Sequence, residues 1–295
     1  MKKSILIISS LTSAALFFLI FGWYIQLHHR VLRIYNSYPH PEQIGEFGRP
    51  AEFISSHLST ITFSYEEPGK TPLLDILGLV QQGKLDGAIT CLYYWGDKDP
   101  VLYLLSSVPF AYGGFYQLHL LNSAKGKDLY ARIGKRHNIV IIPCGIAGIE
   151  INAWWRTVPK TLNDLKGMRA RIPGMAADIF EKFGIKTRHD LTVTQIRKAL
   201  HDRVIDIAEW SSPDDDLRQG FYEETPHAMV PGWHEPGTTS QLIINPKVWN
   251  SLSKQQQEDI KKACEYSFAR LSTLYPILDG DAIVELERRG TIFHQ

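Results

Sequence analysis

Residues 61–90 read ITFSYEEPGKTPLLDILGLVQQGKLDGAIT, and this stretch decides the fold class. We predict strands over 61–65 and 86–90, joined by a helix that begins at Thr71-Pro72 with proline in its first position. The apolar residues of that helix share one face and are Leu73, Leu74, Leu77 and Val80. A strand, a helix and a second strand at this spacing are typical of a parallel α/β sheet.

The alternation of strands and helices continues toward both ends of the chain. We predict further strands over 31–35, 139–142, 149–155, 169–172, 205–210 and 291–293. We predict further helices over 51–58, 117–136, 161–165, 176–183 and 192–202, and a long last helix that begins near Ser253. Thr192 to Gln195 and Ser253 to Gln256 fit capping boxes. Pro276 is expected to kink or end the last helix.

The composition and the charge limit the classes of partner. The 295 residues carry a net charge of +1, with no concentrated run of Lys and Arg, so nucleic acid is excluded as a partner. Three cysteines occur, Cys91, Cys144 and Cys264, without a CxxC pair. We predict that they are buried free thiols, and a disulfide between two of them is the alternative.

The N-terminus predicts an address outside the cytoplasm. Lys2 and Lys3 precede an apolar run over residues 5–25, which is about the length of a bilayer span, ~20 residues. No small-x-small cleavage site follows the run, so we predict an uncleaved signal anchor within residues 1–30, held in the inner membrane. A cleaved signal peptide is the alternative. In both cases the rest of the chain lies in the periplasm.

The sequence carries no motif for catalysis. It has no GxGxxG, Walker A loop, HExxH or GxSxG, and His234 beside Glu235 has no partner at a metal-ligand spacing. We therefore predict that the protein is not an enzyme. One enzymatic rival stays open, a metal-dependent hydrolase that uses Glu209 or Glu235 as its base, although no nucleophile accompanies them.

Charged residues follow two apolar strands at the ends where ligands bind to parallel α/β sheets. In residues 168–174, MRARIPG, strand alternation puts Arg169 and Arg171 on one side. An arginine there can grip a carboxylate through its planar fork, whereas the alternative is a pair of solvated surface charges. Glu209 and Trp210 end the later strand, where a carboxylate can ligate a cation and the indole can wall a pocket. Their alternative roles are a salt bridge and core packing.

A third segment, residues 231–237, reads PGWHEPG and places an aromatic ring and a carboxylate between turn formers. Taken alone, it fits an ordinary interdomain turn. Together, however, the three segments resemble the solute receptors of tripartite ATP-independent periplasmic (TRAP) transporters. The resemblance covers residues 31–295 in order and includes Tyr93-Tyr94-Trp95-Gly96, Val108-Pro109-Phe110, Pro143-Cys144-Gly145 and Gly220-Phe221-Tyr222. It is greatest for the branch that binds 2-oxo acids or lactate with a metal ion.

This resemblance implies a bilobed α/β fold, like that of type II periplasmic binding proteins, with a long C-terminal helix. Residues 31–144 and 237–295 are expected to form one lobe and residues 145–236 the other, with the ligand in the cleft between them. Relatives in this branch extend past the last strand into a helix that can mediate dimerisation, whereas this sequence ends at Gln295, so a dimer is not assumed. The implied partners are a small carboxylate and the membrane subunits of a TRAP transporter. A tethered carboxylate sensor or scaffold without a transporter is the alternative.

The resemblance also implies the roles of individual residues. Arg171 matches the arginine that binds the substrate carboxylate. Glu209, Trp210 and Glu235 match the cation site. Tyr93, Tyr94 and Trp210 are expected to line the apolar part of the cleft. Glu150 stands where the branch has a glutamine, and we assign it to both the substrate and the cation.

Glu150 leads to a hypothesis about charge. Glu150, Glu209 and Glu235 with a bound monocarboxylate bring four negative charges against the one positive charge of Arg171. A monovalent ion leaves two of them unbalanced in a partly buried site, which is costly. The sequence thus predicts that the site holds Ca2+, or holds Na+ with one glutamate protonated.

Overall fold

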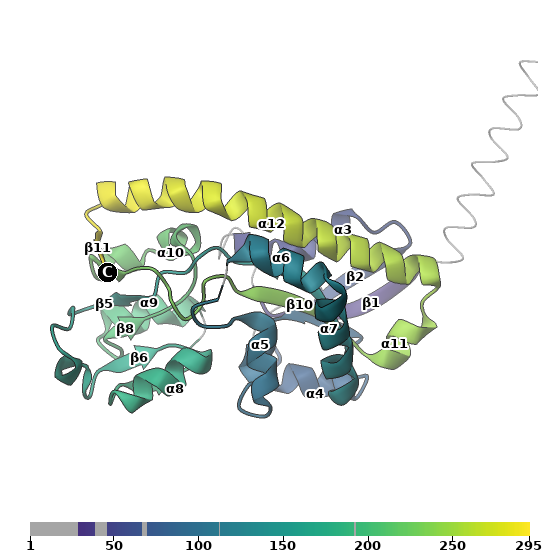
Figure 1. The fold of residues 1–295 in the computed structure, drawn as a ribbon, viewed down its shortest axis with the longest axis horizontal. Coiled ribbons are helices and arrows are strands. Elements are labelled where there is room, and N and C mark those ends of the chain that lie inside the picture. The colour runs from purple at the N-terminus through teal and green to yellow at the C-terminus, as the bar shows by residue number, and fades with distance from the viewer. Residues whose placement is uncertain (1–28, 39–45, 67–69, 112, 192) are drawn as a thin grey trace, which may run out of the picture.

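A computed structural model of the chain describes residues 29–38, 46–66, 70–111, 113–191 and 193–295. The strands form two sheets, each the centre of one lobe, and one long helix runs along both lobes (Figure 1). The predicted bilobed α/β architecture with a long last helix is thereby confirmed. No helix in these described ranges has the length and apolar character needed to cross a membrane. The predicted anchor over residues 5–25 and the capping position of Thr192 lie outside the described residues.

The first sheet has the strand order β2-β1-β3-β10-β4. Its members are β1 (Arg30–Asn36), β2 (Ile61–Glu66), β3 (Gly87–Thr90), β4 (Val140–Ile146) and β10 (Thr239–Ile244). The prediction of parallel pairing is confirmed for β1 with β2 and β3. The sequence prediction missed β10, which pairs antiparallel with both β3 and β4 and makes the sheet mixed.

The second sheet has the strand order β11-β9-β5-β8-β6-β7. Its members are β5 (Ala153–Trp155), β6 (Arg169–Arg171), β7 (Lys186–Arg188), β8 (Ile207–Ala208), β9 (His227–Met229) and β11 (Ile292–His294). The assignment of the last strand to the first lobe was wrong, because β11 pairs with β9. The other predicted lobe boundaries stay a prediction.

Helices cover both sheets. They are α3 (Pro50–Ser56), α4 (Ile76–Gln81), α5 (Tyr103–Ser106), α6 (Gly114–Asn122), α7 (Ala124–Arg136), α8 (Gly174–Lys182), α9 (Val193–His201), α10 (Pro213–Gln219), α11 (Pro246–Ser251) and α12 (Lys254–Arg288). Short 3-10 turns are η1 (Glu46–Gly48), η2 (Leu73–Asp75), η3 (Leu92–Trp95), η4 (Pro100–Leu102), η5 (Leu162–Leu165) and η6 (Phe221–Glu223). The predicted helix over 117–136 is two helices, because the Ser123 hydroxyl accepts the Gly126 N–H and starts α7 anew.

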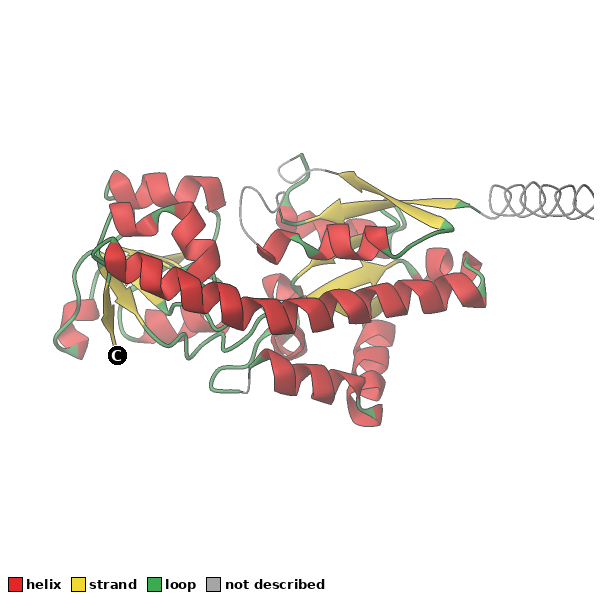
Figure 2. Ribbon diagram, turned by 90° about the horizontal axis from the view of Figure 1, so that it is seen from above, coloured by secondary structure: helices red, strands yellow, loops and turns green. Residues whose placement is uncertain are grey.

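The long helix α12 passes from one lobe to the other (Figure 2). Its capping box at Ser253 and Gln256 is confirmed. Of the two predicted effects of Pro276, a kink or an end of the helix, the end was wrong, since α12 continues to Arg288. Tertiary contacts hold both sides of the proline: Leu271 is buried before it, and Asp279 after it accepts the Ser212 hydroxyl. This packing outweighs the hydrogen bond that proline cannot make.

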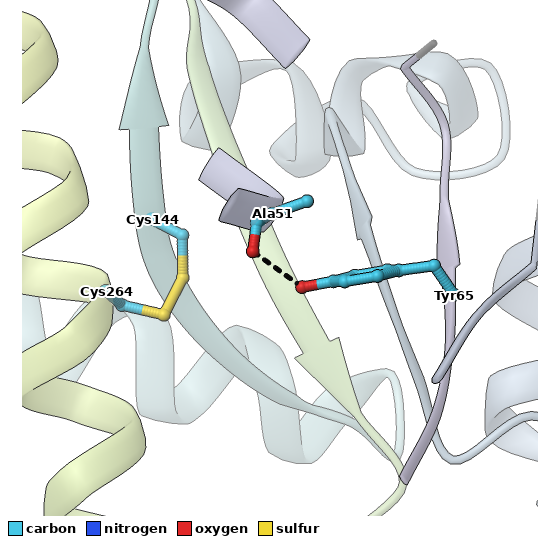
Figure 3. The surroundings of a disulfide bond; sticks show 4 residues. All are labelled: Ala51, Tyr65, Cys144 and Cys264. Carbon is cyan, nitrogen blue, oxygen red and sulfur yellow. Dashed lines mark hydrogen bonds between the residues drawn. A yellow bond between two sulfur atoms is a disulfide. The ribbon is translucent and has the colours of Figure 1, made fainter. Parts of the chain in front are cut away.

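A disulfide ties α12 to the first sheet. Cys144 on β4 is bonded to Cys264 on α12, beside a hydrogen bond from the Tyr65 hydroxyl to the Ala51 carbonyl (Figure 3). The prediction that all three cysteines are free thiols was wrong for this pair. Cys91 is a buried free thiol, as predicted. Residues 120 positions apart meet because the helix crosses the strand, which no local pattern reveals.

Candidate ligand and cation site

The two arginines of β6 lie in different surroundings. Arg169 is exposed and forms an ion pair with Asp206, with 2.8 Å between Nη2 and Oδ1. Arg171 is 5 % exposed, and its Nη1 donates to the Glu209 side chain at 2.8 Å and to the Glu209 carbonyl at 2.9 Å. The surface-charge alternative therefore holds for Arg169 and not for Arg171. The predicted binding arginine is buried against the predicted cation ligand.

Glu150 and Glu235 meet because two chain segments cross the molecule side by side. The Glu150 N–H donates to the Glu235 carbonyl at 3.3 Å, and the Gly232 N–H donates to the Glu150 carbonyl at 2.7 Å. Any Cβ at Gly232 would lie 2.4 Å from that carbonyl oxygen, so glycine is required there. The predicted strand over 149–155 is correspondingly short, because the residues before Ala153 form this crossing.

The Thr238 hydroxyl lies between the two carboxyl groups. It is 3.1 Å from Glu150 Oε1 and also contacts Glu235 Oε2. A hydroxyl has one proton to donate, so both contacts are favourable only if one carboxyl group is itself protonated. The alternative is a cation close to both groups.

His234 completes the cluster, and the sequence prediction missed it. The ring is 2 % exposed, and its Nε2 lies 3.7 Å from Glu150 Oε2 and 3.8 Å from Glu209 Oε1. Glu150, His234 and Glu235 each offer a ligand atom, and these atoms lie within 4.8 Å of one another. Glu150 is distant in sequence, so the spacing around His234 could not reveal it. The adjacent Glu235 was the one available signal.

The three glutamates have opposed pKa shifts. Burial, followed by the charges of Glu235 and Glu209, raises the pKa of Glu150 well above its ordinary value. Burial and the Glu209 charge also raise the pKa of Glu235. Burial favours a higher pKa for Glu209 as well, but contact with His234 and the charge of Arg171 hold this pKa below its ordinary value. Burial and mutual repulsion therefore favour either a proton or a cation within the cluster.

Polar atoms around the cluster lack partners. Among the described residues, the buried atoms without a hydrogen bond include Glu150 Oε2, Arg171 Nε, Trp210 Nε1 and His234 Nε2. An unpaired buried polar group costs roughly 1–3 kcal/mol. A carboxylate oxygen of Glu150 and the unused N–H donors of Arg171 and Trp210 match a site that takes a cation and an anion together. The donor set therefore fits the predicted pair of ligands.

Aromatic rings enclose the cluster. The ring of Tyr93 packs edge-on to Tyr94 at 4.6 Å, and the Arg171 guanidinium lies 5.5 Å from the centre of the Trp210 ring. Tyr38, which the sequence prediction missed, is buried in the same cluster as Tyr93. A small space of about 10 Å³ remains between Tyr93 on the first lobe and Met175 on the second, bordered by His234 and Glu235. That volume is close to the room that one water needs.

Residues 71–295 match the DctP family, bacterial extracellular solute-binding protein, family 7. The chain belongs to this family. The predicted resemblance is thus confirmed over most of the sequence, and the family is one of solute-binding proteins rather than of enzymes.

Proteins similar to this DctP-family protein bind small carboxylates. The chain is 31% identical over 258 residues to a monocarboxylate 2-oxoacid-binding periplasmic protein of Nostoc sp.. This match covers 85% of this chain and 70% of the Nostoc protein. A TRAP solute-binding protein of Bordetella bronchiseptica, with calcium and picolinate, superposes with a TM-score of 0.83 at 23% identity, over 90% of this chain and 80% of that one. One of Colwellia psychrerythraea, with calcium and pyruvate, has a TM-score of 0.82 at 24% identity, over 90% and 82%. These two structures establish the fold.

Proposed function

We propose that this chain is an extracytoplasmic TRAP-type solute receptor that binds a small monocarboxylate, a 2-oxo or 2-hydroxy acid, together with a cation. The observation that supports it most is the burial of Arg171 against Glu209, next to Glu150, His234 and Glu235. The ligands of the Nostoc and Colwellia relatives support the same class of acid. The receptor then delivers the acid to the membrane subunits of its transporter.

Arg171 and Trp210 bind the acid in this proposal. The unused Nε of Arg171 and the Trp210 indole N–H are buried donors, and a carboxylate accepts two such bonds. Tyr93 and Tyr94 restrict the length of the acid, because the buried ring of Tyr93 packs against the half-buried ring of Tyr94. A short acid such as pyruvate is therefore preferred over a dicarboxylate, which would bring a second charge into an already acidic site.

The cation is held by carboxylate oxygens of Glu150, Glu209 and Glu235. Oxygen ligands suit Ca2+ or Na+. Arg171 already neutralises Glu209, so Glu150, Glu235 and the bound acid leave three negative charges. Ca2+ balances two of them, and Na+ balances one. We therefore propose Ca2+ as the preferred ion, with Na+ binding when a glutamate keeps its proton; a relative from Pseudoalteromonas atlantica contains sodium and pyruvate.

Calorimetry tests the receptor and the cation together. EDTA-treated protein is titrated with pyruvate alone, then with sodium present, then with calcium present. Affinity is expected to rise in that order. Affinity that is equal in all three conditions would contradict a cation in the site.

Alanine variants of the two arginines on β6 test which side chain binds the anion. Arg171→Ala is expected to abolish pyruvate binding, whereas Arg169→Ala, which removes an exposed ion pair, is expected to leave it unchanged. Pyruvate binding that survives Arg171→Ala, in protein whose circular dichroism is unchanged, would exclude the anchoring role. This result would leave the cation site in place, so the two parts fail separately.

The location and the delivery step are part of the same proposal. The apolar run over residues 5–25 would hold the receptor at the inner membrane, near the transporter, where tethering raises its effective concentration. Carbonate extraction of membranes tests this point. Full-length protein that stays in the membrane pellet supports a tether, and release into the soluble periplasmic fraction supports signal cleavage.

A further inference from the structure

A groove of about 860 Å³ lies on the first lobe, and its lining includes none of the glutamates, the arginine or the histidine of the candidate site. Helices α7 and α12 form its walls and β4 lies at its base. Its apolar lining includes Leu121, Tyr130, Ile141, Trp249 and Phe268. The volume falls within the range of about 300–1,000 Å³ that is usual for binding sites.

The strand at the base of the groove is the last strand of its sheet. In the described residues the strand order ends at β4, whose one strand partner is β10. The Asn245 N–H donates to the Asp86 carbonyl. Main-chain N–H and carbonyl groups point to alternate sides along a strand, so those of odd-numbered residues of β10 point toward β3 and those of even-numbered residues toward β4. Leu242 therefore forms main-chain hydrogen bonds with its partner Ile142. The main-chain N–H and carbonyl of the preceding residue, Ile141, consequently point away from β10.

Two further observations agree with this alternation. The Ile139 N–H, two residues earlier, donates to the Gly134 carbonyl on α7 rather than to β10. Pro143, two residues later, has no N–H, and proline is tolerated in a strand where its nitrogen faces an unpaired edge. The N–H and carbonyl of Ile141 and the carbonyl of Pro143 are thus directed toward the groove.

The rim of the groove is mainly basic. Lys127 and Lys135 line it from α7, and Lys261 and Lys262 line it from α12. The two acidic residues of the lining are Glu258 and Glu265, and Glu258 is 2.7 Å from the Lys261 ammonium. Four positive charges against two negative ones favour an anionic occupant.

We propose that this groove binds an extended acidic segment of another polypeptide, which adds as a strand beside β4. Strand addition supplies hydrogen-bond partners to the outward-facing groups of β4, while the lysines attract acidic side chains. An acyl chain could fill the apolar lining but could not pair with the main chain of Ile141. The proposal concerns a surface apart from the carboxylate site, so it holds or fails independently of the receptor function.

The test uses a synthetic seven-residue peptide, capped at both ends, in which valine alternates with glutamate. Fluorescence anisotropy of the labelled peptide is expected to show binding that weakens as salt is added. A peptide of equal charge with its central valine replaced by proline cannot complete the ladder and is expected to bind at least tenfold more weakly. In hydrogen exchange, the amide of Ile141 is expected to gain protection when the peptide binds.

Variants on α7 locate the site. Ala131 is exposed and lines the groove, so Ala131→Trp is expected to block binding, whereas Lys125→Trp, on the same helix but outside the lining, is its control. Replacing Lys127 and Lys135 by Glu is expected to weaken binding about tenfold. The same charge change at Lys125 and Arg132, outside the lining, is expected to have little effect. Circular dichroism and thermal unfolding of each variant verify its fold.

Several outcomes overturn the proposal. One is a dissociation constant above about 1 mM for the acidic peptide. Another is equal binding of the proline-containing peptide, or binding that Ala131→Trp leaves unchanged. Displacement of the peptide by dodecanoate, with no change in Ile141 exchange, shows an amphiphile site instead and also contradicts strand addition.

Discussion

Arg169 and Arg171 show how much a two-residue step can change the role of a side chain. Both face the same side of β6, but Arg169 lies at its exposed start and Arg171 at its buried end. The buried guanidinium holds a charge pair that is costly unless every polar atom is satisfied. The Arg171 Nε has no hydrogen-bond acceptor, so a bound anion that accepts from it would stabilise the folded protein.

Glu150 is predicted to determine whether the site prefers Ca2+ or Na+. Glu150→Gln removes one negative charge from the cluster and retains an oxygen ligand. Calcium-supported affinity for pyruvate is expected to fall by about tenfold or more, while sodium-supported affinity is expected to hold or rise. Calorimetry in each salt measures both, with the exposed Glu287→Gln as the control. A variant that keeps its preference for calcium would show that Glu150 does not set the ion.

At the scale of elements, α12 and α10 share a buried group of aspartates. Asp279 on α12 accepts from the Ser212 hydroxyl and the Asp214 N–H, and Asp215 accepts from Ser211 and Tyr275. Burial raises the pKa of Asp215 to about 8 and that of Asp279 to about 7. Both carboxyl groups are therefore protonated in the folded protein over a range where the unfolded chain has lost these protons.

The raised pKa values of Asp215 and Asp279 make the folded protein less stable as the pH rises. A raised folded pKa gives stability that is full below the unfolded value, about 4, and is lost as pH rises through about 7 to 8. The melting temperature is expected to be higher at pH 6 than at pH 9. Asp279→Asn keeps its acceptor and is expected to reduce this slope, whereas the exposed Asp281→Asn is not. An unchanged slope in Asp279→Asn would contradict the raised pKa.

The disulfide between β4 and α12 supports a second prediction for elements. It closes a loop of about 120 residues, which constrains the unfolded chain. Replacing Cys144 and Cys264 by alanine is expected to lower the free energy of unfolding by about 2–4 kcal/mol and to leave pyruvate affinity unchanged. Denaturant unfolding measures the loss. Thiol counting in denaturant provides the control, with one free thiol expected before reduction and three after it.

At the scale of the whole molecule, Phe110 bridges the lobes. The residue is 80 % exposed, yet its ring stacks on that of Trp233 at 5.3 Å and its main-chain N–H donates to the Trp233 carbonyl. Trp233 packs against the core of the second lobe, whereas Phe110 lies between α5 and α6 of the first. The φ of Phe110 is 60°, a costly value for a bulky residue, so tertiary contacts hold this conformation.

Phe110→Ala is expected to speed pyruvate release. Loss of an aromatic stack worth about 0.5–1.5 kcal/mol corresponds to a rise of about twofold to tenfold in the dissociation rate. Stopped-flow fluorescence measures that rate, with Phe183→Ala, another exposed ring on the second lobe, as the control. Equal release rates for Phe110→Ala and the unaltered protein would show that the stack does not hold the lobes together.

The sequence by itself determined the fold class and, through its resemblance, the family, and it proposed most residues of the candidate site. Alternating strands and helices specify a parallel α/β arrangement because their periods are local properties of the chain. Local pattern also marked Arg171, Glu209 and Trp210 as candidates, because they lie at the ends of recognisable strands, but it left their alternative roles open. The resemblance gave these residues their predicted roles and added Glu235, Glu150, Tyr93 and Tyr94.

Only the tertiary structure decided what depends on distant segments meeting. The chain crossing at Gly232 brings His234 to Glu150, and the crossing of α12 over β4 brings Cys264 to Cys144. The same holds for β10, which pairs with two strands far from it in sequence, and for Pro276, where packing outweighs a local signal. Contacts of this kind depend on long-range burial, which a window of neighbouring residues does not encode.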